Sequence, residues 1–294
     1  MLKVAVVGCG LIALKKHLPA FLALRKQCSL VGLCDSQTER AQRAARDLGI
    51  PGAYRDLPSM LSGERPDLVD VCTPPAAHAH LAAQALRGGA AVLVEKPMAL
   101  TIADCHQMVE AASRSGRSLG VLHNQLFNPA FLAAQELFRQ GELGSFAGMR
   151  IRFSTPTHYM TSQKDHWAHR LPGGVLGETG PHAVYLSLAF LENVREVAVC
   201  ARKVLSDYPW SPFEDFRIDL VADNGISSIW LTYANDDWAA EVDLLGTRGS
   251  LKVDLQAQMV LRYKRPSLAA RDVGLSVLRQ QVEGPGGLGM AGRA

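Results

Sequence analysis

The chain has 294 residues, of which 48% are hydrophobic and 20% charged, and its formal net charge is +3. A chain of this length and apolar content can bury a large core and is expected to form two domains. Its lysines and arginines are dispersed and form no basic stripe interleaved with aromatics, so no nucleic-acid partner is predicted. No apolar run approaches the roughly 20 residues that cross a bilayer, so no membrane partner is predicted either.

The six cysteines show neither a CxxC pair nor a cysteine–histidine spacing typical of a metal site. Several lie in apolar, strand-like runs, so we interpret them as buried thiols of a cytoplasmic protein and predict no metal. The stretch around Cys9 resembles a lipoprotein cleavage box, which would instead indicate secretion. Only eight residues precede Cys9, too few for a charged region plus an apolar signal core, so we favour the cytoplasm.

The first predicted strand, residues 2–7, leads directly into a GxGxxA turn and then a helical pattern. In this context the turn is typical of dinucleotide binding. Gly8 permits the tight turn, and Gly10 lets a pyrophosphate approach the backbone. The N–H groups at the start of the helix, near Leu11 and Ile12, are expected to meet the phosphate charge.

A second strand, residues 29–34, ends in Asp35, 25 residues after the second glycine of the turn. An acidic residue here accepts hydrogen bonds from the adenosine ribose and repels a 2′-phosphate. Neither Ser36 nor Gln37 is an arginine that would bind such a phosphate, so we favour NAD over NADP. The alternative is that Asp35 only caps the helix predicted over residues 38–48.

Residues 67–72 and 90–94 are two further apolar strands. The second ends in Glu95, Lys96 and Pro97, which places charged groups at the carboxyl end of a buried parallel strand, where ligands of α/β sheets bind. Lys96 is therefore a candidate functional lysine. The alternative is an ordinary strand exit with a solvated ammonium group.

Strands and helices alternate in this way throughout residues 1–122. A helix with a capping box at Thr101 and a sixth strand over residues 118–122 complete the pattern. The alternation predicts an α/β Rossmann domain with a doubly wound parallel sheet.

These motifs together resemble the glucose-fructose oxidoreductase / inositol dehydrogenase (Gfo/Idh/MocA) family. The resemblance is carried by the glycine turn with Asp35, by Thr73-Pro74-Pro75 with His78, and by Glu95-Lys96-Pro97. Family members pair a Rossmann domain with a large, mostly antiparallel sheet, and mostly oxidise or reduce sugars, inositols and related polyols with NAD or NADP. The resemblance implies an NAD(P)-dependent dehydrogenase, with Thr73, Pro74, His78, Glu95 and Lys96 at the cofactor.

The second half fits this expectation. From Phe146 onward, alternating segments predict an α+β domain with a large, mostly antiparallel sheet over residues 123–283, including a glycine hairpin at residues 245–251. A broad, half-apolar sheet is a natural subunit interface, and the resemblance implies a homodimer or homotetramer formed through it. A helix over residues 268–282 and a flexible glycine-rich tail at 284–294 are expected to follow.

Residues 166–185 are the other stretch that contains candidate catalytic residues. Glycines and then Gly180-Pro181 predict a helix that starts there and carries His182 in its first turn, where the helix dipole disfavours an imidazolium. Glu178 is close enough in sequence to orient this imidazole. The alternative is that His182 is only a polar residue on a core helix.

The same stretch is similar to the family's GGxxxDxGxH signature, which implies that Lys96, Glu178 and His182 form the catalytic group. Glu178 stands where aspartate is usual, and Tyr185 occupies a position often held by aspartate. His182 would be the general base in oxidation, and Lys96 would bind the reacting oxygen. By the same resemblance, Asn124 would lie near the nicotinamide carboxamide.

Substrate contacts are expected from Lys96, His182 and a group of aromatic and cationic residues between the predicted strands, since such groups suit a polyhydroxylated ligand. This group comprises Trp167, His169 and Arg170, together with His158 and Tyr159. Each could equally be a domain-interface residue. A second hypothesis for the whole chain is a non-catalytic sensor that binds a dinucleotide and signals through partners.

Overall fold

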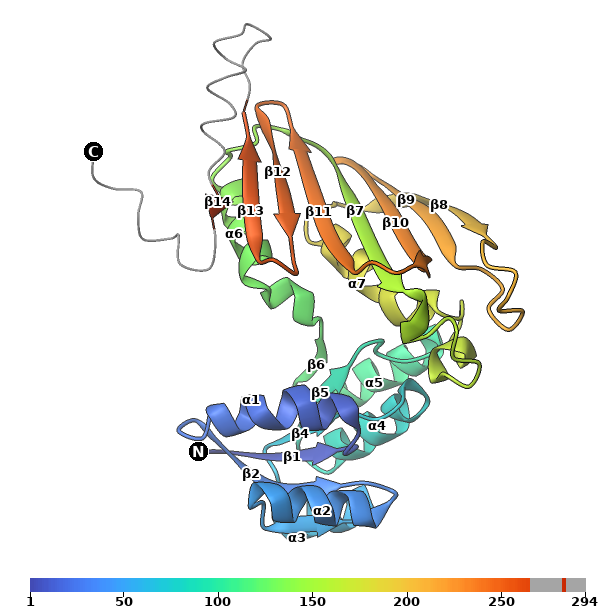
Figure 1. The fold of residues 1–294 in the computed structure, drawn as a ribbon. Coiled ribbons are helices and arrows are strands. Elements are labelled where there is room, and N and C mark those ends of the chain that lie inside the picture. Colours follow the sequence, from blue (N-terminus) through green and yellow to red (C-terminus); the bar gives the residue numbers. More distant parts are fainter. Residues whose placement is uncertain (265–281, 284–294) are drawn as a thin grey trace, which may run out of the picture. The chain divides into compact units, whose positions relative to one another are not determined.

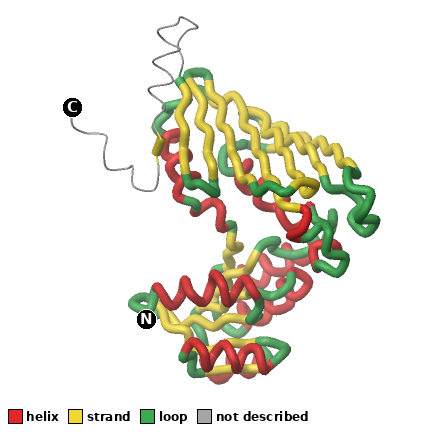
Figure 2. The backbone as a smooth tube through the Cα atoms, viewed as in Figure 1, coloured by secondary structure: helices red, strands yellow, loops and turns green. Residues whose placement is uncertain are grey.

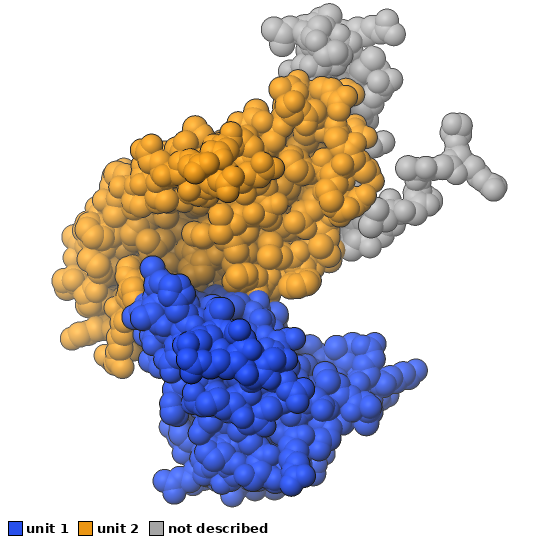
Figure 3. Space-filling model, turned by 180° about the vertical axis from the view of Figure 1, so that it is seen from behind, with its two compact units in different colours: residues 1–122 blue, residues 123–294 orange. Residues whose placement is uncertain are grey.

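The computed structural model describes residues 1–264 and 282–283. The chain divides into two compact units, Met1–Leu122 and His123–Ala294 (Figure 3). The expected helix over residues 268–282 and the expected tail at 284–294 lie outside the described residues, except that Val282 belongs to a short strand. None of the helices in the described part of the chain has the length and apolar character needed to cross a membrane.

The first unit is built on a six-stranded sheet in which every neighbouring pair is parallel (Figure 1). The strand order is β3-β2-β1-β4-β5-β6. The strands are β1 (Leu2–Val7), β2 (Cys28–Cys34), β3 (Gly52–Tyr54), β4 (Leu68–Val71), β5 (Ala91–Glu95) and β6 (Leu119–Leu122). The predicted doubly wound parallel sheet is confirmed.

Helices cover both faces of this sheet (Figure 2). They are α1 (Leu18–Ala23, preceded by a π-helical turn at Ala13–His17), α2 (Thr38–Leu48), α3 (Leu57–Glu64), α4 (His78–Arg87) and α5 (Ile102–Ser115). Side chains of β1 alternate between two cores: Val6 packs with α1 and α2, whereas Ala5 and Val7 pack with α3, α4 and α5. Because successive side chains of a strand point to opposite faces of the sheet, β1 contributes to the core on each face.

The N-cap half of the capping box predicted at Thr101 is present, and the Asp104 carboxylate accepts a hydrogen bond from the Thr101 hydroxyl. The Thr101 hydroxyl accepts a hydrogen bond from the Asp104 N–H at 3.1 Å, and the helix ends at Gly116 in the left-handed conformation. Both ends of α5 are therefore satisfied by local sequence, as expected for a helix with this pattern.

The second unit contains an eight-stranded sheet in the order β14-β13-β12-β11-β7-β10-β9-β8. Its strands are β7 (Phe146–Pro156), β8 (Val194–Arg202), β9 (Asp215–Ala222), β10 (Gly225–Asn235), β11 (Ala239–Gly246), β12 (Gly249–Asp254), β13 (Met259–Tyr263) and β14 (Val282–Glu283). Neighbours are antiparallel except β7 and β10. The sheet is mostly antiparallel, as predicted, and the predicted hairpin joins β11 to β12 at Gly246 and Gly249.

One face of this second sheet packs with α6 (Pro129–Arg139) and α7 (Leu176–Leu188) around a large apolar core. Charged side chains and Trp230 line a small pocket elsewhere on the sheet, where Arg150 pairs with Asp243. The Arg217 guanidinium lies 4.0 Å from the Trp230 ring centroid. Since side chains alternate along a strand, the apolar and charged sets share the same strands.

We expect Gly8→Ala to destabilise the first unit. Gly8 has φ of +94°, and a Cβ there would lie 2.7 Å from the carbonyl oxygen of Cys72. The strain and the clash should lower the free energy of unfolding by about 2 kcal/mol or more. Urea denaturation followed by circular dichroism measures this.

Gly10→Ala is the matched control, because no heavy atom lies within 4 Å of an added Cβ at Gly10. It should leave the free energy of unfolding nearly unchanged. Equal losses in the two variants would contradict the assignment of the tight turn to Gly8.

Candidate active site

Several of the residues singled out from the sequence follow the carboxyl ends of parallel strands in the first unit. Gly8 follows β1, Asp35 follows β2, Thr73 and Pro74 come after β4, and Lys96 follows β5. In a parallel sheet these ends lie along one edge, which is where ligands of such sheets bind. Leu11 and Ile12, after the turn, are 73% and 41% exposed.

Asp35 connects the glycine turn to the start of α2. One carboxylate oxygen accepts the Cys9 N–H at 2.8 Å, and the other accepts the Gln37 N–H at 2.8 Å. Asp35 therefore fixes the turn as well as the helix entry, and Gln37 itself is the N-cap residue of α2. Each oxygen has a second lone pair with which a ribose hydroxyl could be bound.

His78 braces two loops of the same unit. It is fully buried, and its ring nitrogens lie 2.8 Å from the Thr73 carbonyl oxygen and 3.0 Å from that of Pro97. The Lys96–Pro97 peptide bond is cis. The imidazole thus ties the segment after β4 to the segment that carries Lys96, which is partly buried.

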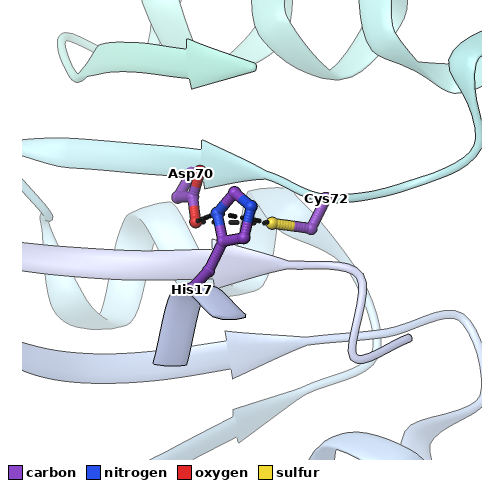
Figure 4. Close-up of side chains that lie close together, drawn as sticks. All are labelled: His17, Asp70 and Cys72. Atoms are coloured by element: carbon purple, nitrogen blue, oxygen red, sulfur yellow. Dashed lines mark hydrogen bonds and ion pairs between the residues drawn. The ribbon is translucent and has the colours of Figure 1, made fainter. Parts of the chain in front are cut away.

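His17 is a buried histidine that we did not identify from the sequence. It lies between two carboxylates near the carboxyl ends of the parallel strands and compensates their charge. His17 Nδ1 lies 2.8 Å from an Asp70 oxygen (Figure 4), and Nε2 lies 2.9 Å from a Glu95 oxygen. The other Glu95 oxygen accepts the Lys96 N–H at 2.9 Å. His17 therefore supports the strand end at which Lys96 begins its turn.

Electrostatics favour the charged form of this histidine. Burial alone would lower the pKa of His17, but the hydrogen bonds and negative charges of Asp70 and Glu95 outweigh it and raise the pKa to about 9. The ring is then an imidazolium that donates from both nitrogens. Asp70 is a carboxylate within an otherwise apolar strand, and a buried charge needs a partner. This was the signal in the sequence from which a residue such as His17 could have been expected.

The same cluster has the donor set of a metal site, because ligand atoms of His17, Asp70 and Cys72 all lie within 4.8 Å of one another. The separation of 2.8 Å between His17 Nδ1 and the Asp70 oxygen is a hydrogen-bond length. Tetrahedral zinc would hold such N and O ligands about 3.3 Å apart. The distance between His17 Nδ1 and the Asp70 oxygen therefore fits a hydrogen bond better than joint coordination of a metal ion.

In the second unit, α7 begins earlier than predicted. It starts at Leu176, with Pro181 inside it, so His182 is not in the first turn and the dipole argument for its protonation state was wrong. The proline removes only one helical hydrogen bond, and the two glycines that precede it in α7 let the helix pack closely: a Cβ at Gly177 would lie 2.5 Å from the Pro172 carbonyl oxygen. Glu178 occupies the first turn instead.

Glu178 and His182 are four residues apart on α7, so they lie on one face of the helix. The Thr179 hydroxyl donates to Glu178 at 2.8 Å. His182 Nδ1 lies 2.5 Å from the Tyr185 hydroxyl oxygen, and that hydroxyl also contacts Asn124. Asn124 thus takes part in a hydrogen-bond chain with the candidate catalytic histidine.

The candidate substrate residues form a partly exposed aromatic group. Trp167 and Tyr159 are 44% and 46% exposed, and Tyr159 lies edge-on to Trp238, which we did not identify from the sequence, at 4.9 Å between ring centroids. Burial and the negative charge of Glu178 raise the pKa of Tyr159. His169 instead binds the Met160 carbonyl oxygen through Nε2. Arg170 is exposed.

The fold and the glycine turn define a Rossmann domain followed by a second, mostly antiparallel domain. Residues 2–123 match the model of the oxidoreductase family with an NAD-binding Rossmann fold, and residues 131–269 match the GFO/IDH/MocA C-terminal domain. The chain belongs to the Gfo/Idh/MocA family.

Two of the relatives are named as dehydrogenases of a sugar and of inositol. The chain is 31% identical over 204 residues to D-apiose dehydrogenase of Paraburkholderia graminis, which covers 69% of this chain and 53% of that protein. It is 28% identical over 167 residues to inositol 2-dehydrogenase of Salmonella paratyphi B, covering 55% and 49%. The chain therefore spans about half the length of these curated relatives.

A solved structure of levoglucosan dehydrogenase with NADH and levoglucosan shares the fold, with a TM-score of 0.82 at 20% identity. The match covers 92% of this chain and 78% of that one. At this identity the likeness extends to the fold alone.

The imidazolium of His17 should make stability depend on pH. Its pKa is raised above the ordinary value of 6.5, so its contribution is complete below about pH 6.5 and is lost as the pH rises through about 9. Near pH 6, His17→Gln should lower the free energy of unfolding by about 3 kcal/mol, and the difference from wild type should shrink toward about pH 10.

Urea denaturation at a series of pH values measures this difference. His80→Gln, at an exposed position of α4, is the control and should show no such trend. A difference that is constant or grows with pH would exclude a charged His17.

Proposed function

We propose that the protein is an NAD-dependent oxidoreductase that transfers a hydride between the nicotinamide and a secondary alcohol or ketone of a sugar, inositol or related polyol. The observation that carries this proposal is in the first unit, where the glycine turn and the Glu95-Lys96-Pro97 segment follow strands of one parallel sheet. Family membership and the activities of the relatives support the substrate class.

The residues of the turn fit a dinucleotide. Nothing lies within 4 Å of a Cβ added at Gly10, so the backbone there is open to a pyrophosphate. Asp35 would bind the ribose and disfavour a 2′-phosphate, which favours NAD over NADP. Further contacts are proposed from Leu11, Ile12, Thr73, Pro74, Glu95, Lys96 and Asn124. His78 is fully buried, so it would act by holding the segments after β4 and β5 in place rather than by touching the cofactor.

A bound nicotinamide would supply the hydride acceptor at its C4. The chain's own residues would move and hold the proton. In oxidation, His182 would accept the proton of the substrate hydroxyl, and in reduction it would return it. Lys96 would donate a hydrogen bond to the same oxygen and stabilise its negative charge as the C–H bond breaks. Glu178, one turn before His182, would assist in orienting the substrate or the imidazole.

The aromatic group favours a ligand with both apolar and hydroxylated faces. Rings of Tyr159, Trp167 and Trp238 remain partly exposed, which suits packing against the C–H face of a sugar ring. Arg170 and His169 would contribute polar contacts beside them.

We further propose that copies of the chain associate through the second sheet as a homodimer or homotetramer. Charged pairs such as Arg150 with Asp243, beside the partly exposed Trp230, support this role. All six cysteines are free thiols, which supports a reducing, cytoplasmic setting.

Substitution of Lys96 and His182 tests the proposed chemistry. NADH formation would be followed on a panel of pentoses, hexoses, inositols, sugar acids and nucleotide sugars. Lys96→Met should lower kcat about 100-fold through loss of oxyanion stabilisation. His182→Asn should lower it by about 100-fold or more through loss of the base.

Lys26→Met, at an exposed position, is the matched control and should keep full activity. If the wild type binds NAD but turns over no member of the panel, the proposed dehydrogenase activity on these substrates is wrong. A non-catalytic sensor would then account better for the bound dinucleotide.

Asp35→Asn tests the choice of cofactor. The amide removes the charge that disfavours a 2′-phosphate and leaves one oxygen to accept from the Cys9 or the Gln37 N–H, so the Kd for NAD should rise about tenfold while the ratio of the NADP Kd to the NAD Kd falls. Isothermal titration with both cofactors measures the ratio, with Asp47→Asn, at an exposed position of α2, as control. An unchanged ratio would remove Asp35 from cofactor discrimination.

A further inference from the structure

We infer that two copies of the chain associate edge to edge through β8, which joins their eight-stranded sheets into one continuous sheet around a twofold axis at Val199. This inference rests on the proposed association through the second sheet. It specifies the surface, which is the free edge of the sheet rather than its charged face.

Strand β8 (Val194–Arg202) is the last strand of the sheet, and within the described part of the chain it pairs only with β9 (Figure 1). Alternate N–H and C=O groups of an edge strand point away from the sheet and can pair with a further strand. Residues 196–202 keep a regular register with β9, so this edge is straight over most of its length. It therefore offers a row of backbone groups to a second strand.

The edge strand also exposes apolar side chains. Val197 and Val199 are 58% and 59% exposed. They lie opposite Leu220 and Ile218 of β9, which belong to the buried core of this unit. Directly opposite residues of neighbouring strands point to the same face of a sheet. The apolar face thus reaches the edge strand, and a strand added beside β8 would cover part of both valines.

The sequence of β8 complements itself in one antiparallel register. When Val199 lies opposite Val199 of a second copy, Glu196 lies opposite Arg202, and Val197 lies opposite Ala201. Twofold symmetry makes the pair of opposite charges occur twice. A slip of two residues, the smallest that keeps the apolar faces together, places Glu196 opposite Cys200 or Val204 and removes both pairs.

The same register places Arg195 opposite Lys203, and both are cations. Each already has a carboxylate partner in its own chain: Arg195 pairs with Asp223 at 2.8 Å, and Lys203 pairs with the buried Glu214 at 2.6 Å. Their repulsion across the interface is therefore reduced. The charges of Glu196 and Arg202 select the partner, which is a second copy of this chain.

Cysteine crosslinking of the full-length protein tests the register. In a Cys200→Ala background, Val199→Cys would place two thiols directly opposite each other. The Cα atoms would be about 4.5–5.5 Å apart, which a disulfide can span. Val197→Cys is the matched control, because this valine shares the strand, the face and the exposure but would lie four residues along the strand from its copy. Under mild oxidation, the covalent dimer should form at least about tenfold faster with Val199→Cys.

Charge reversal tests the ion pairs. Glu196→Arg or Arg202→Glu alone would replace two attractive pairs with two repulsive ones, so the Kd of the dimer should rise about tenfold or more. Combining the two substitutions restores opposite charges in exchanged positions and should return the Kd to that of the wild type. Sedimentation velocity over a range of concentrations measures the Kd. A variant that lost affinity only by misfolding would not be rescued in this way.

Equal crosslinking at the two valine positions, or a Kd that the single reversals leave unchanged, would overturn the edge interface. If the chain still dimerises in that case, the proposed association through the second sheet stands and must use another part of the sheet. A wild-type chain that stays monomeric at every concentration would overturn both. These outcomes do not depend on whether the protein turns over any substrate.

Discussion

A single buried imidazolium balances the charge inside the parallel sheet. Asp70 and Glu95 come from neighbouring strands, and His17 lies 2.8 Å from one and 2.9 Å from the other. Removing the shared partner would leave the buried Asp70 and the partly buried Glu95 without their positive partner, a loss of several kcal/mol in comparable cases. Because Glu95 also accepts the Lys96 N–H, the contacts that balance the core are the ones that fix the backbone at Lys96. Stability and placement of the proposed site therefore have a common origin.

In the second unit, His182 has a different kind of hydrogen-bond partner from that of His17. His17 is clamped between negative charges, whereas His182 meets the neutral hydroxyl of Tyr185. A carboxylate adds charge that favours protonation, while a phenol directs the ring mainly through hydrogen-bond geometry. The environment of His17 suits charge compensation near neutral pH, and proton exchange at His182 stays part of the proposed function.

Local periodicity was sufficient to predict both sheets, and the positions of glycine and threonine predicted the tight turn after β1, the N-cap of α5 and the β11–β12 hairpin. The start of α7 was wrong because glycine and proline normally punctuate a helix, whereas here the absence of a Cβ at Gly177 permits close packing against Pro172. His17 and Tyr185 were not recognised as organising residues. Their partners lie 53 and 61 residues away, and only the folded chain brings them into contact. The catalytic roles of Lys96, Glu178 and His182 stay predictions.

The turn Asn124–Phe127 begins two residues after β6 ends at Leu122. Two of the groups that surround the Tyr185 hydroxyl are thus encoded immediately after the dinucleotide-binding sheet, yet they belong to the unit that carries His182. Exchange of the first unit between related genes would preserve this arrangement only if the crossover falls before Asn124. A crossover a few codons later would combine one parent's turn with the other parent's α7, and the contacts of the Tyr185 hydroxyl would then join residues that were never selected together.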